Sequence, residues 1–405
     1  MTVSHATTAE PGPRVQSLNV SRYLSFQDDH QRSWWEHTAP LLSRILESAQ
    51  YDLHHQHLYL VLYRSLLVPF LGPHPHQWDS FITYCGLPVE FSINYQDHGP
   101  PTARIGWEPV SHLSGTPDDV FNLHTVEKAV STLSKLSLKG FDTQLFTHFL
   151  KTLTVSHEQA ATIDVAQLPI SRFKNQASFG LDLKGGEVTV KCYIYPALKG
   201  YVTGYSFRQL LDDALHAGSA LAPYPEALSV VHDYMESAGL YNQYSFLGFD
   251  FVNPVKSRLK IYATVQEVSW AKIQDIWMVG GRFRDDLNLQ RGLGFARELW
   301  LRLTGDTDKM AVGIWNYELA PGSAVPMSKW YFILHGQSDY ENAQAVVSFY
   351  QSLGWIDLAK RFLPSFQSYF PTQDLKETTH LLQYVSLAYS EKTGPYVSVY
   401  YHSSE

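Results

Sequence analysis

Cationic and phenolic side chains alternate with apolar ones in a short stretch near the middle of the sequence. Arg258, Lys260 and Tyr262 occupy every second position, with Leu259 and Ile261 between them. This two-residue period predicts a β-strand with one apolar and one polar face. Two cations beside a hydroxyl group suit a polyanion such as a diphosphate. The alternative is a polar face that simply contacts water.

Other segments repeat this alternation, and their polar positions carry related groups. In sequence order these positions are Glu90, Ser92, Asn94, Arg104, Gly106, Glu108, Lys191, Tyr193, Tyr195, Lys329, Tyr331, Tyr396, Ser398 and Tyr400. If all these faces meet, five cations gather among tyrosines, and Glu90 and Glu108 are the main acids. A solvated surface normally mixes both signs of charge. The pattern therefore favours a basic cavity.

The alternating segments form five pairs around turn signals that contain glycine or proline. We predict strands at 89–95 with 104–110, 178–183 with 187–195, 246–252 with 257–264, 312–319 with 329–334, and 384–389 with 396–402. Helical periodicity precedes each pair, at about 28–50, 56–71, 123–137, 142–155, 206–217, 223–238, 268–277, 287–303, 340–353 and 355–361.

About ten antiparallel strands can close into a barrel that has no free edges and is wide enough for a cavity. We predict an α+β fold: a ten-stranded antiparallel barrel with a solvent-accessible lumen, five ααββ repeats and a surrounding ring of helices. Residues 1–20 are expected to form a flexible N-terminal tail, and residues 21–405 a single barrel domain.

The composition limits the classes of partner. With 405 residues, 44% of them hydrophobic and 17% charged, the chain has enough apolar residues for a large core. The formal net charge of −8 argues against nucleic-acid binding. Cys85 and Cys192 are the only cysteines, which excludes a disulfide scaffold. No apolar run reaches the ~18 residues of a membrane span. We expect a cytoplasmic protein without a membrane partner, as a monomer or homodimer.

The high aromatic content suggests a specific chemistry. Aromatic residues make up 14% of the chain, including 25 tyrosines. Ring faces stabilise a carbocation, and a basic cluster stabilises a diphosphate leaving group. Metal-dependent prenyl chemistry would show an Asp-Asp-x-x-Asp cluster, but each Asp-Asp pair of this sequence lacks the third aspartate. We therefore expect no metal site and no required cofactor, with Mg²⁺ or Ca²⁺ at most stimulatory.

Several motifs along the sequence together carry a specific family resemblance. The sequence resembles the fungal indole prenyltransferases of the dimethylallyltryptophan synthase family over nearly its whole length. The stretches that carry the resemblance are Trp34-Trp35 before Thr38-Ala39-Pro40, Gly86-x-Pro88-x-Glu90-x-Ser92, Arg104 through Glu108-Pro109, Lys191-x-Tyr193-x-Tyr195-Pro196, Ser257-Arg258-x-Lys260-x-Tyr262, Trp277 near Gly280-Gly281-Arg282, and Tyr396-x-Ser398-x-Tyr400. The resemblance implies the prenyltransferase (ABBA-type) barrel and transfer of a dimethylallyl group without a bound metal.

The resemblance also implies roles for individual residues. Glu90 would accept a hydrogen bond from an indole N–H, although it could instead merely neutralise Arg104. The diphosphate site would comprise Arg104, Lys191, Arg258, Lys260, Lys329, Tyr193, Tyr262, Tyr331, Tyr396 and Tyr400, and some of these tyrosines would shield the dimethylallyl cation. The acceptor pocket would comprise Glu90, Gly106, Tyr195 and Ile82.

Four departures from the family pattern narrow the substrates. Ser245 stands where members that take free tryptophan hold its carboxylate with an arginine, and Gly106 leaves room for a larger acceptor. Ser178 replaces a lysine of members that prenylate C4, and Lys329 adds a cation where glutamine is common. We expect dimethylallyl diphosphate and an indole acceptor, a tryptophan-containing cyclic dipeptide, with attack from C2, C3 or N1.

Two alternatives stay open. One is the same chemistry on free tryptophan, tyrosine or another aromatic acceptor. The other is a barrel without enzymatic activity that binds an amphiphilic aromatic ligand.

Overall fold

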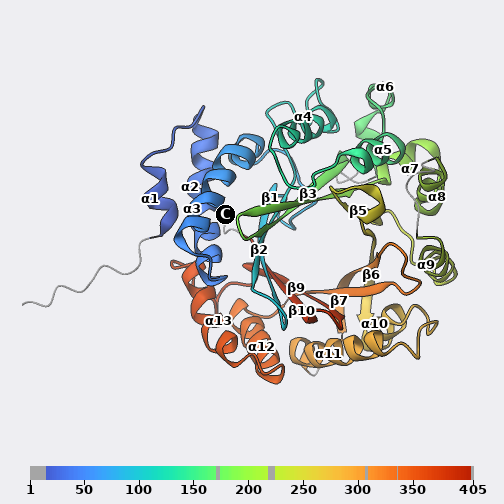
Figure 1. Cartoon of the computed structure of the whole chain (residues 1–405). Coiled ribbons are helices and arrows are strands. Elements are labelled where there is room, and N and C mark those ends of the chain that lie inside the picture. Colours follow the sequence, from blue (N-terminus) through green and yellow to red (C-terminus); the bar gives the residue numbers. More distant parts are fainter. Residues whose placement is uncertain (1–14, 170–173, 218–223, 306–308, 335, 403–405) are drawn as a thin grey trace, which may run out of the picture.

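The computed structural model describes residues 15–169, 174–217, 224–305, 309–334 and 336–402. Its centre is a closed antiparallel barrel in which each strand pairs with its neighbours in sequence and β1 pairs with β10 (Figure 1). The strands are β1 (Val89–Gln96), β2 (Thr102–Trp107), β3 (Ala177–Lys184), β4 (Glu187–Ile194), β5 (Phe246–Asp250), β6 (Leu259–Ser269), β7 (Lys309–Leu319), β8 (Met327–Ile333), β9 (Leu382–Ser390) and β10 (Gly394–Tyr401). The predicted barrel is confirmed.

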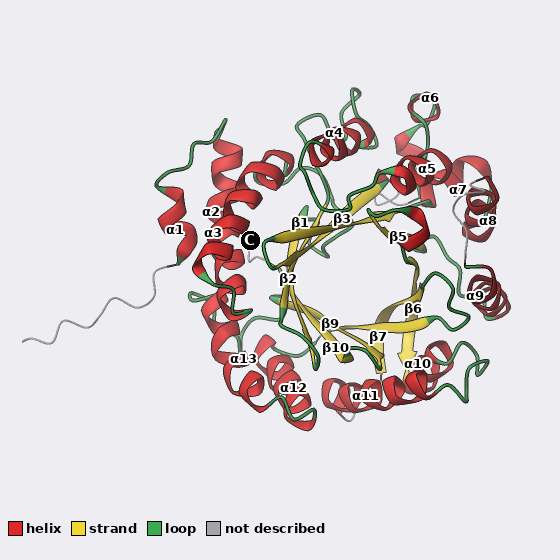
Figure 2. Cartoon of the chain, in the orientation of Figure 1, coloured by secondary structure: helices red, strands yellow, loops and turns green. Residues whose placement is uncertain are grey.

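The helices surround the barrel as a ring (Figure 2). They are α1 (Gln16–Ser21), α2 (Asp29–Ser48), α3 (Leu53–Leu62), α4 (Leu123–Ser134), α5 (Gln144–Leu153), α6 (His157–Ala160), α7 (Ala197–Thr203), α8 (Phe207–Ala217), α9 (Pro225–Ser237), α10 (Trp270–Trp277), α11 (Leu287–Thr304), α12 (Asp339–Ser352) and α13 (Ile356–Tyr369). Two or three of these helices precede each hairpin, which confirms the predicted repeat.

The hydrophobic core lies between the outer face of the barrel and the helices. Leu259 and Ile261, the apolar positions of the first motif, are fully buried there. Trp315 of β7 and Trp330 of β8 stack on the same face, with ring centroids 5.9 Å apart. Burial of such side chains drives the strands to present their apolar face outward.

The polar face therefore points into the lumen, and several of its side chains keep contact with water. The side chain of Arg258 is 38% exposed, and those of Lys260 and Glu90 are 14% and 12% exposed. This partial exposure inside a closed barrel indicates a lumen that solvent enters. The alternation recognised in the sequence is thus the alternation between core and lumen.

Some predicted boundaries are wrong. The proposed tail of residues 1–20 is too long, because Gln16–Ser21 forms α1, whose Ser21 Oγ accepts a hydrogen bond from Trp35 Nε1 at 2.7 Å. Residues 1–14 lie outside the described residues. Helix α13 continues to Tyr369, past the predicted end at 361, because its buried apolar positions recur along the whole segment. Strand β6 begins at Leu259, so Arg258 lies in the turn before it.

Within the described residues, no helix combines the length and the apolarity that crossing a membrane requires.

Candidate active site

The five predicted cations gather at one end of the barrel. Four of them belong to the second strand of a hairpin: Arg104 on β2, Lys191 on β4, Lys260 on β6 and Lys329 on β8. Arg258 occupies the turn just before β6. Because hairpin turns all lie at the same barrel end, the repeated fold places these side chains together. We call this set the basic cluster.

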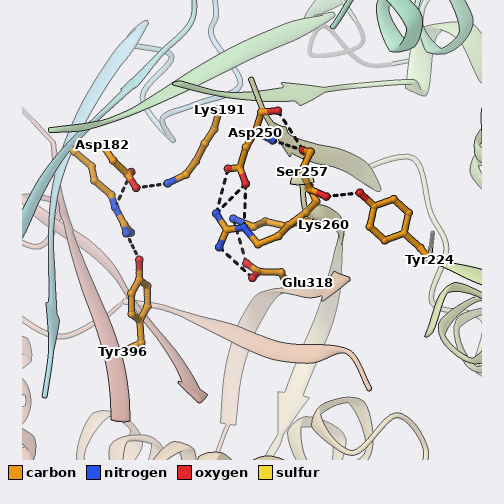
Figure 3. Close-up of polar contacts among 10 residues, drawn as sticks. Asp182, Lys191, Tyr224, Asp250, Ser257, Lys260, Glu318 and Tyr396 are labelled. Carbon is orange, nitrogen blue, oxygen red and sulfur yellow. Dashed lines mark hydrogen bonds and ion pairs between the residues drawn. The ribbon is translucent and has the colours of Figure 1, made fainter. Parts of the chain in front are cut away.

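Asp182 of β3 joins two members of the basic cluster. Its carboxylate forms ion pairs with Arg104 Nε at 3.0 Å and Lys191 Nζ at 2.5 Å (Figure 3). Arg104 also donates to Ser398 Oγ at 3.2 Å and to the Tyr396 hydroxyl. Burial alone would raise the pKa of Asp182, but Arg104 and Lys191 hold it well below its usual range. Burial lowers the pKa of Lys191 to about 7 despite the ion pair.

Two further carboxylates hold the cations of the first motif. Arg258 donates two hydrogen bonds to Asp250, at 2.9 and 3.2 Å, and a third to Glu318 at 3.1 Å. Lys260 Nζ lies 3.4 Å from the same Glu318 carboxylate. Burial opposes charge on Lys260, yet Glu318 raises the pKa of this ammonium group above its usual value. Both cations therefore point into the lumen, as the sequence pattern requires.

Hydrogen bonds hold the turn before β6, from which Arg258 projects. Ser257 Oγ accepts from the Asp250 amide at 3.1 Å, and the Tyr224 hydroxyl donates to the Ser257 carbonyl (Figure 3). These contacts tie helix α9 to the β5–β6 hairpin. They set the backbone from which Arg258 projects.

Lys329 lies among aromatic rings. Its ammonium group is 4.9 Å from the ring centroid of Tyr331 and 5.4 Å from that of Tyr396, both cation–π distances. Burial, reinforced by Arg104 and Lys260, lowers the pKa of Lys329 well below its usual value. A bound anion would relieve this repulsion.

The distribution of acids differs from the one predicted. Asp182, Asp250 and Glu318 line the basic end, whereas the sequence pattern gave Glu90 and Glu108 as the main inward acids. Counted at their formal charges, the five cations exceed these three carboxylates by two positive charges. Such an excess suits a diphosphate anion.

Glu108 has a structural role instead of facing the lumen. It is fully buried, and its carboxylate accepts hydrogen bonds from Trp78 Nε1 at 2.9 Å, Ser80 Oγ at 2.5 Å and Asn175 Nδ2 at 2.8 Å. Burial raises the pKa of this carboxyl group. Since residue 108 lies beyond the end of β2, the alternation no longer places it in the lumen. It anchors the loop that closes the far end of the barrel.

A belt of tyrosine rings lies between the two ends. The ring centroid of Tyr262 lies 5.8 Å from that of Tyr193 and 6.2 Å from that of Tyr331. Tyr331 in turn lies 6.1 Å from Tyr400, which is 4.4 Å from Tyr384. We call these five residues the tyrosine belt. Their π faces can stabilise an allylic cation and exclude water from it.

Glu90 lies at the end of the lumen opposite the basic cluster. Its Oε2 accepts a hydrogen bond from the Tyr384 hydroxyl at 2.5 Å and lies 3.3 Å from His402 Nε2. The side chain covers Gly106, where an added Cβ would be 2.7 Å from Glu90 Cγ. The space left by Gly106 thus accommodates Glu90. Because Asp182 is the ion-pair partner of Arg104, a role for Glu90 as the counter-ion of Arg104 is not supported.

Aromatic side chains surround the same end. Phe81 lies 4.7 Å from Tyr195 and 6.1 Å from Phe246, between ring centroids, and the half-buried Ile82 follows it. Tyr195 is fixed by a 2.6 Å hydrogen bond with Ser178. The predicted pocket residues Glu90, Gly106, Tyr195 and Ile82 thus belong to one region of the barrel and the loop that closes it.

Ser245 has no charge to offer an acceptor and is engaged locally. It is buried, and its Oγ accepts from the Asn242 amide at 3.1 Å. The residue therefore helps to shape the turn before β5. A carboxylate would find no cation at this position.

One group of potential metal ligands occurs in the described residues, far from the lumen on α4 and α6. It comprises His124, Glu127 and His157, all exposed. The two imidazole rings stack at 4.0 Å and an interplanar angle of 15°. Parallel rings cannot both direct an in-plane nitrogen lone pair at one ion, so this arrangement is not a metal site as it stands.

Comparisons with known proteins agree with this geometry. The profile of the family described as tryptophan dimethylallyltransferase matches residues 30–365. The chain belongs to this family. Among curated relatives, prenyltransferase phqJ of Penicillium fellutanum is 44% identical over 383 residues, 93% of this chain and 94% of its own. Prenyltransferase malE of Malbranchea aurantiaca is 41% identical over 403 residues, 95% of this chain and 91% of its own.

Solved structures of related proteins share the whole fold. The crystal structure of NotF in complex with brevianamide F and DMSPP matches with a TM-score of 0.90 and 37% identity, covering 96% of this chain and 99% of NotF. That of AnaPT from Neosartorya fischeri matches with a TM-score of 0.87 and 28% identity, covering 96% and 98%. These matches confirm the resemblance found in the sequence: the protein is a prenyltransferase with the ABBA barrel.

Several residues of this prenyltransferase site were missed in the sequence. They are Asp182, Asp250, Glu318, Phe246, Tyr384 and His402. The acids had a signal, because each occupies the inward-facing parity of a predicted strand. Tyr384 had the same signal, because it is the first residue of the predicted strand 384–389. His402 also had this signal, because it is the last residue of the predicted strand 396–402, although the observed β10 ends at Tyr401.

Proposed function

We propose that this protein transfers a dimethylallyl group from dimethylallyl diphosphate to the indole ring of a tryptophan-containing cyclic dipeptide, in indole alkaloid biosynthesis. The observation that carries the proposal is the order of groups along the lumen. The basic cluster occupies one end, Glu90 occupies the other, and the tyrosine belt lies between them. A diphosphate and an indole would thus meet at the aromatic layer.

The geometry supports an ionisation mechanism. The bond between the allylic carbon and the diphosphate oxygen breaks, and its electron pair leaves with the diphosphate, whose charge the basic cluster stabilises. The tyrosine belt faces the resulting dimethylallyl cation and keeps water from it. An indole atom then forms the new bond, and loss of a ring proton restores aromaticity unless the product cyclises.

Glu90 supplies the acceptor end of this mechanism. Its carboxylate can accept a hydrogen bond from the indole N–H, which increases electron density on the ring and hence its nucleophilicity. Its hydrogen bond from Tyr384 fixes the carboxylate in the lumen. We assign Glu90 as the catalytic residue that activates the indole acceptor.

The local chemistry at Ser245 supports a neutral acceptor. A cyclic dipeptide has no free carboxylate, and the buried Ser245 would offer none of the ion pairs that a free amino acid requires. NotF, whose structure contains brevianamide F, shares 37% of its residues with this chain.

We further propose that the reaction needs no metal ion. The cations of the basic cluster can occupy the positions that Mg²⁺ fills around a diphosphate in other enzymes. Arg258 and Lys260 are already directed into the lumen by carboxylates that a diphosphate can displace.

An incubation of the purified protein with dimethylallyl diphosphate and EDTA tests the proposal. The acceptor panel comprises brevianamide F, other tryptophan-containing cyclic dipeptides, free tryptophan and free tyrosine, and mass spectrometry detects prenylated products. We expect a singly prenylated cyclic dipeptide in the presence of EDTA. No prenylated product, a strict requirement for Mg²⁺, or a preference for a free amino acid would contradict the proposal.

A further inference from the structure

The two oxygens of the Glu90 carboxylate have different surroundings. Oε2 accepts from the Tyr384 hydroxyl at 2.5 Å and lies 3.3 Å from His402 Nε2. Oε1 lies over Gly106, 3.0 Å from the position that a Cβ would take there. No hydrogen bond of the described residues engages Oε1. One oxygen is thus held by the protein, and the other remains for a ligand.

His402 is built into this arrangement by the end of the barrel. It follows β10, and its backbone amide donates to the Leu381 carbonyl at 3.2 Å, which extends the pairing with β9. The side chain is 2% exposed, so it cannot turn away into solvent. Its ring stands edge-on to that of Tyr384, with centroids 6.3 Å apart.

The other ring nitrogen of His402 contacts the loop before β1. Nδ1 lies 4.0 Å from Cys85 Sγ, and Cys85 itself donates to Thr83 Oγ1 at 3.6 Å. The sulfur is therefore available as an acceptor for the imidazole. With acceptors at both nitrogens, the ring is suited to carry two protons, since only imidazolium donates from both.

The groups that face His402 come from three elements, and they favour its charged form. Glu90 comes from β1, Cys85 from the loop before β1, and Tyr384 from β9. Burial lowers the pKa of His402, but the contacts with Cys85 and Glu90 outweigh burial and raise it above the usual value.

We propose that His402 is a positioning residue for Glu90: as an imidazolium it holds Oε2 together with Tyr384, which leaves Oε1 as the oxygen that receives the acceptor N–H. This inference rests on the proposed function and deepens it. His402 does not touch the acceptor and moves no proton. It fixes the orientation of the Glu90 carboxylate.

The experiment measures kcat and KM separately for the acceptor and for dimethylallyl diphosphate, from pH 6 to pH 9. With dimethylallyl diphosphate kept saturating at every pH, kcat/KM of the wild type for the acceptor should fall as the pH rises through the His402 pKa, because the imidazolium is the active form. His402→Leu should lower kcat/KM for the acceptor about 10–100-fold, as expected for a lost hydrogen bond to a charged group. The KM for dimethylallyl diphosphate should stay unchanged.

Two milder variants separate position from charge. His402→Asn keeps an N–H donor, so it should recover part of the kcat/KM that His402→Leu loses. The fall of kcat/KM with rising pH, which we call the pH limb, should disappear in this variant. Cys85→Ala removes a contact that favours the imidazolium, so the limb should move to lower pH. His232→Asn is the matched control, because His232 is also buried beside a carboxylate, Asp212 at 3.3 Å, but lies on α9 outside the barrel. It should leave the limb where it is.

The outcomes are distinct. A wild type that does not prenylate any acceptor refutes the proposed function itself. An active wild type whose acceptor kinetics survive His402→Leu, or whose pH limb survives His402→Asn, refutes the positioning role. If His402→Leu does not fold, as judged by thermal unfolding, then an unmoved limb in Cys85→Ala still overturns the inference.

Discussion

Lys329 lies directly opposite Ala388 on the neighbouring strand β9. At the equivalent contacts between the preceding hairpins, a cation lies opposite a carboxylate: Arg104 opposite Asp182, Lys191 opposite Asp250, and Lys260 opposite Glu318. The repeat thus pairs its charges three times and then omits the acid. The cation of the fourth hairpin therefore lacks the directly opposite carboxylate that the other three have.

A carboxylate opposite Lys329, which would give the fourth hairpin the same charge pair as the other three, should weaken diphosphate binding. Ala388→Asp places a carboxylate opposite Lys329, so that the lysine gains an internal partner and the cluster loses one positive charge. We expect the affinity for pyrophosphate or a thiolodiphosphate analogue to fall about tenfold or more, as for loss of one close charge pair. Calorimetric titration measures it. Ala388→Ser adds a polar group without charge and should bind normally; equal weakening by both substitutions would contradict the charge argument.

Diphosphate binding should take up protons. Burial lowers the pKa of Lys191 to about 7, and burial also lowers the pKa of Lys329 well below its usual value. In the ligand-free protein these groups lose protons as the pH rises, whereas a bound anion favours their charged forms. Above pH 7 the affinity should therefore fall with rising pH, by at most about tenfold per pH unit for each proton taken up.

Calorimetry in two buffers of different ionisation enthalpy measures this proton uptake. Lys191→Met should reduce the uptake, because one of the titrating groups is gone. An affinity that is independent of pH between 7 and 9 would show that both lysines are already charged in the free protein.

Removing Asp182 should destabilise the ligand-free protein and increase the stabilisation that pyrophosphate provides. Asp182→Asn leaves Arg104 and Lys191 without their shared carboxylate, and breaking a buried ion pair costs about 3–5 kcal/mol. Because the pKa of Asp182 is lowered, its contribution is present above the unfolded-state pKa and is lost as the pH falls through the folded-state pKa. Thermal unfolding with and without pyrophosphate checks this, and the ligand-induced shift should be larger in the variant.

Gly106 should be required for the orientation of Glu90. These residues are directly opposite each other in the β1–β2 hairpin, and an alanine Cβ would lie 2.7 Å from Glu90 Cγ. Gly106→Ala should therefore displace Glu90 and lower kcat/KM for the acceptor about 10²-fold or more, comparable to Glu90→Gln. Diphosphate affinity should not change in either variant. Gly294→Ala, on α11 with no atom within 4 Å of the added Cβ, is the matched control.

Tyr331 should protect the allylic cation from water. It is the central member of the tyrosine belt, within 6.2 Å of Tyr262, Tyr384 and Tyr400. Tyr331→Leu removes a π face, so the fraction of dimethylallyl diphosphate that becomes dimethylallyl alcohol should rise. Tyr331→Phe retains the face and should keep the wild-type product ratio, which chromatography of the two products measures. An increase in both variants would assign the effect to the hydroxyl group instead.

The sequence predicted the barrel and its cations because both depend on local periodicity. Leu259 and Ile261 mark the outer face within a few residues, and the alternate positions then fall in the lumen without knowledge of any partner. The acids opposite the cations depend on the pairing between different hairpins. Arg104 meets Asp182 only because β2 pairs with β3 across α4, α5 and α6, and no turn sets that register.

The acceptor end was less predictable for a related reason. Glu90 lies within β1 and was found. The predicted strands 104–110 and 396–402 run past the observed ends of β2 and β10, so Glu108 was wrongly placed in the lumen and His402 was not named. Where a strand ends, alternation no longer determines the direction of a side chain. Whether such a residue faces the lumen depends on the loops that close the barrel, and these have no periodic signal.

Closure of the barrel by β1 and β10 has a consequence for folding. Asn94 donates to the Val397 carbonyl at 3.2 Å across a sequence separation of 303 residues. Until the hairpin of β9 and β10 docks, β1 and β8 both have unpaired backbone groups, and the apolar outer face lacks part of its cover. Contacts so distant in sequence close slowly because the chain must lose loop entropy first. Early in refolding, the open sheet should therefore be prone to edge-to-edge association, and refolding at low protein concentration should favour the closed barrel.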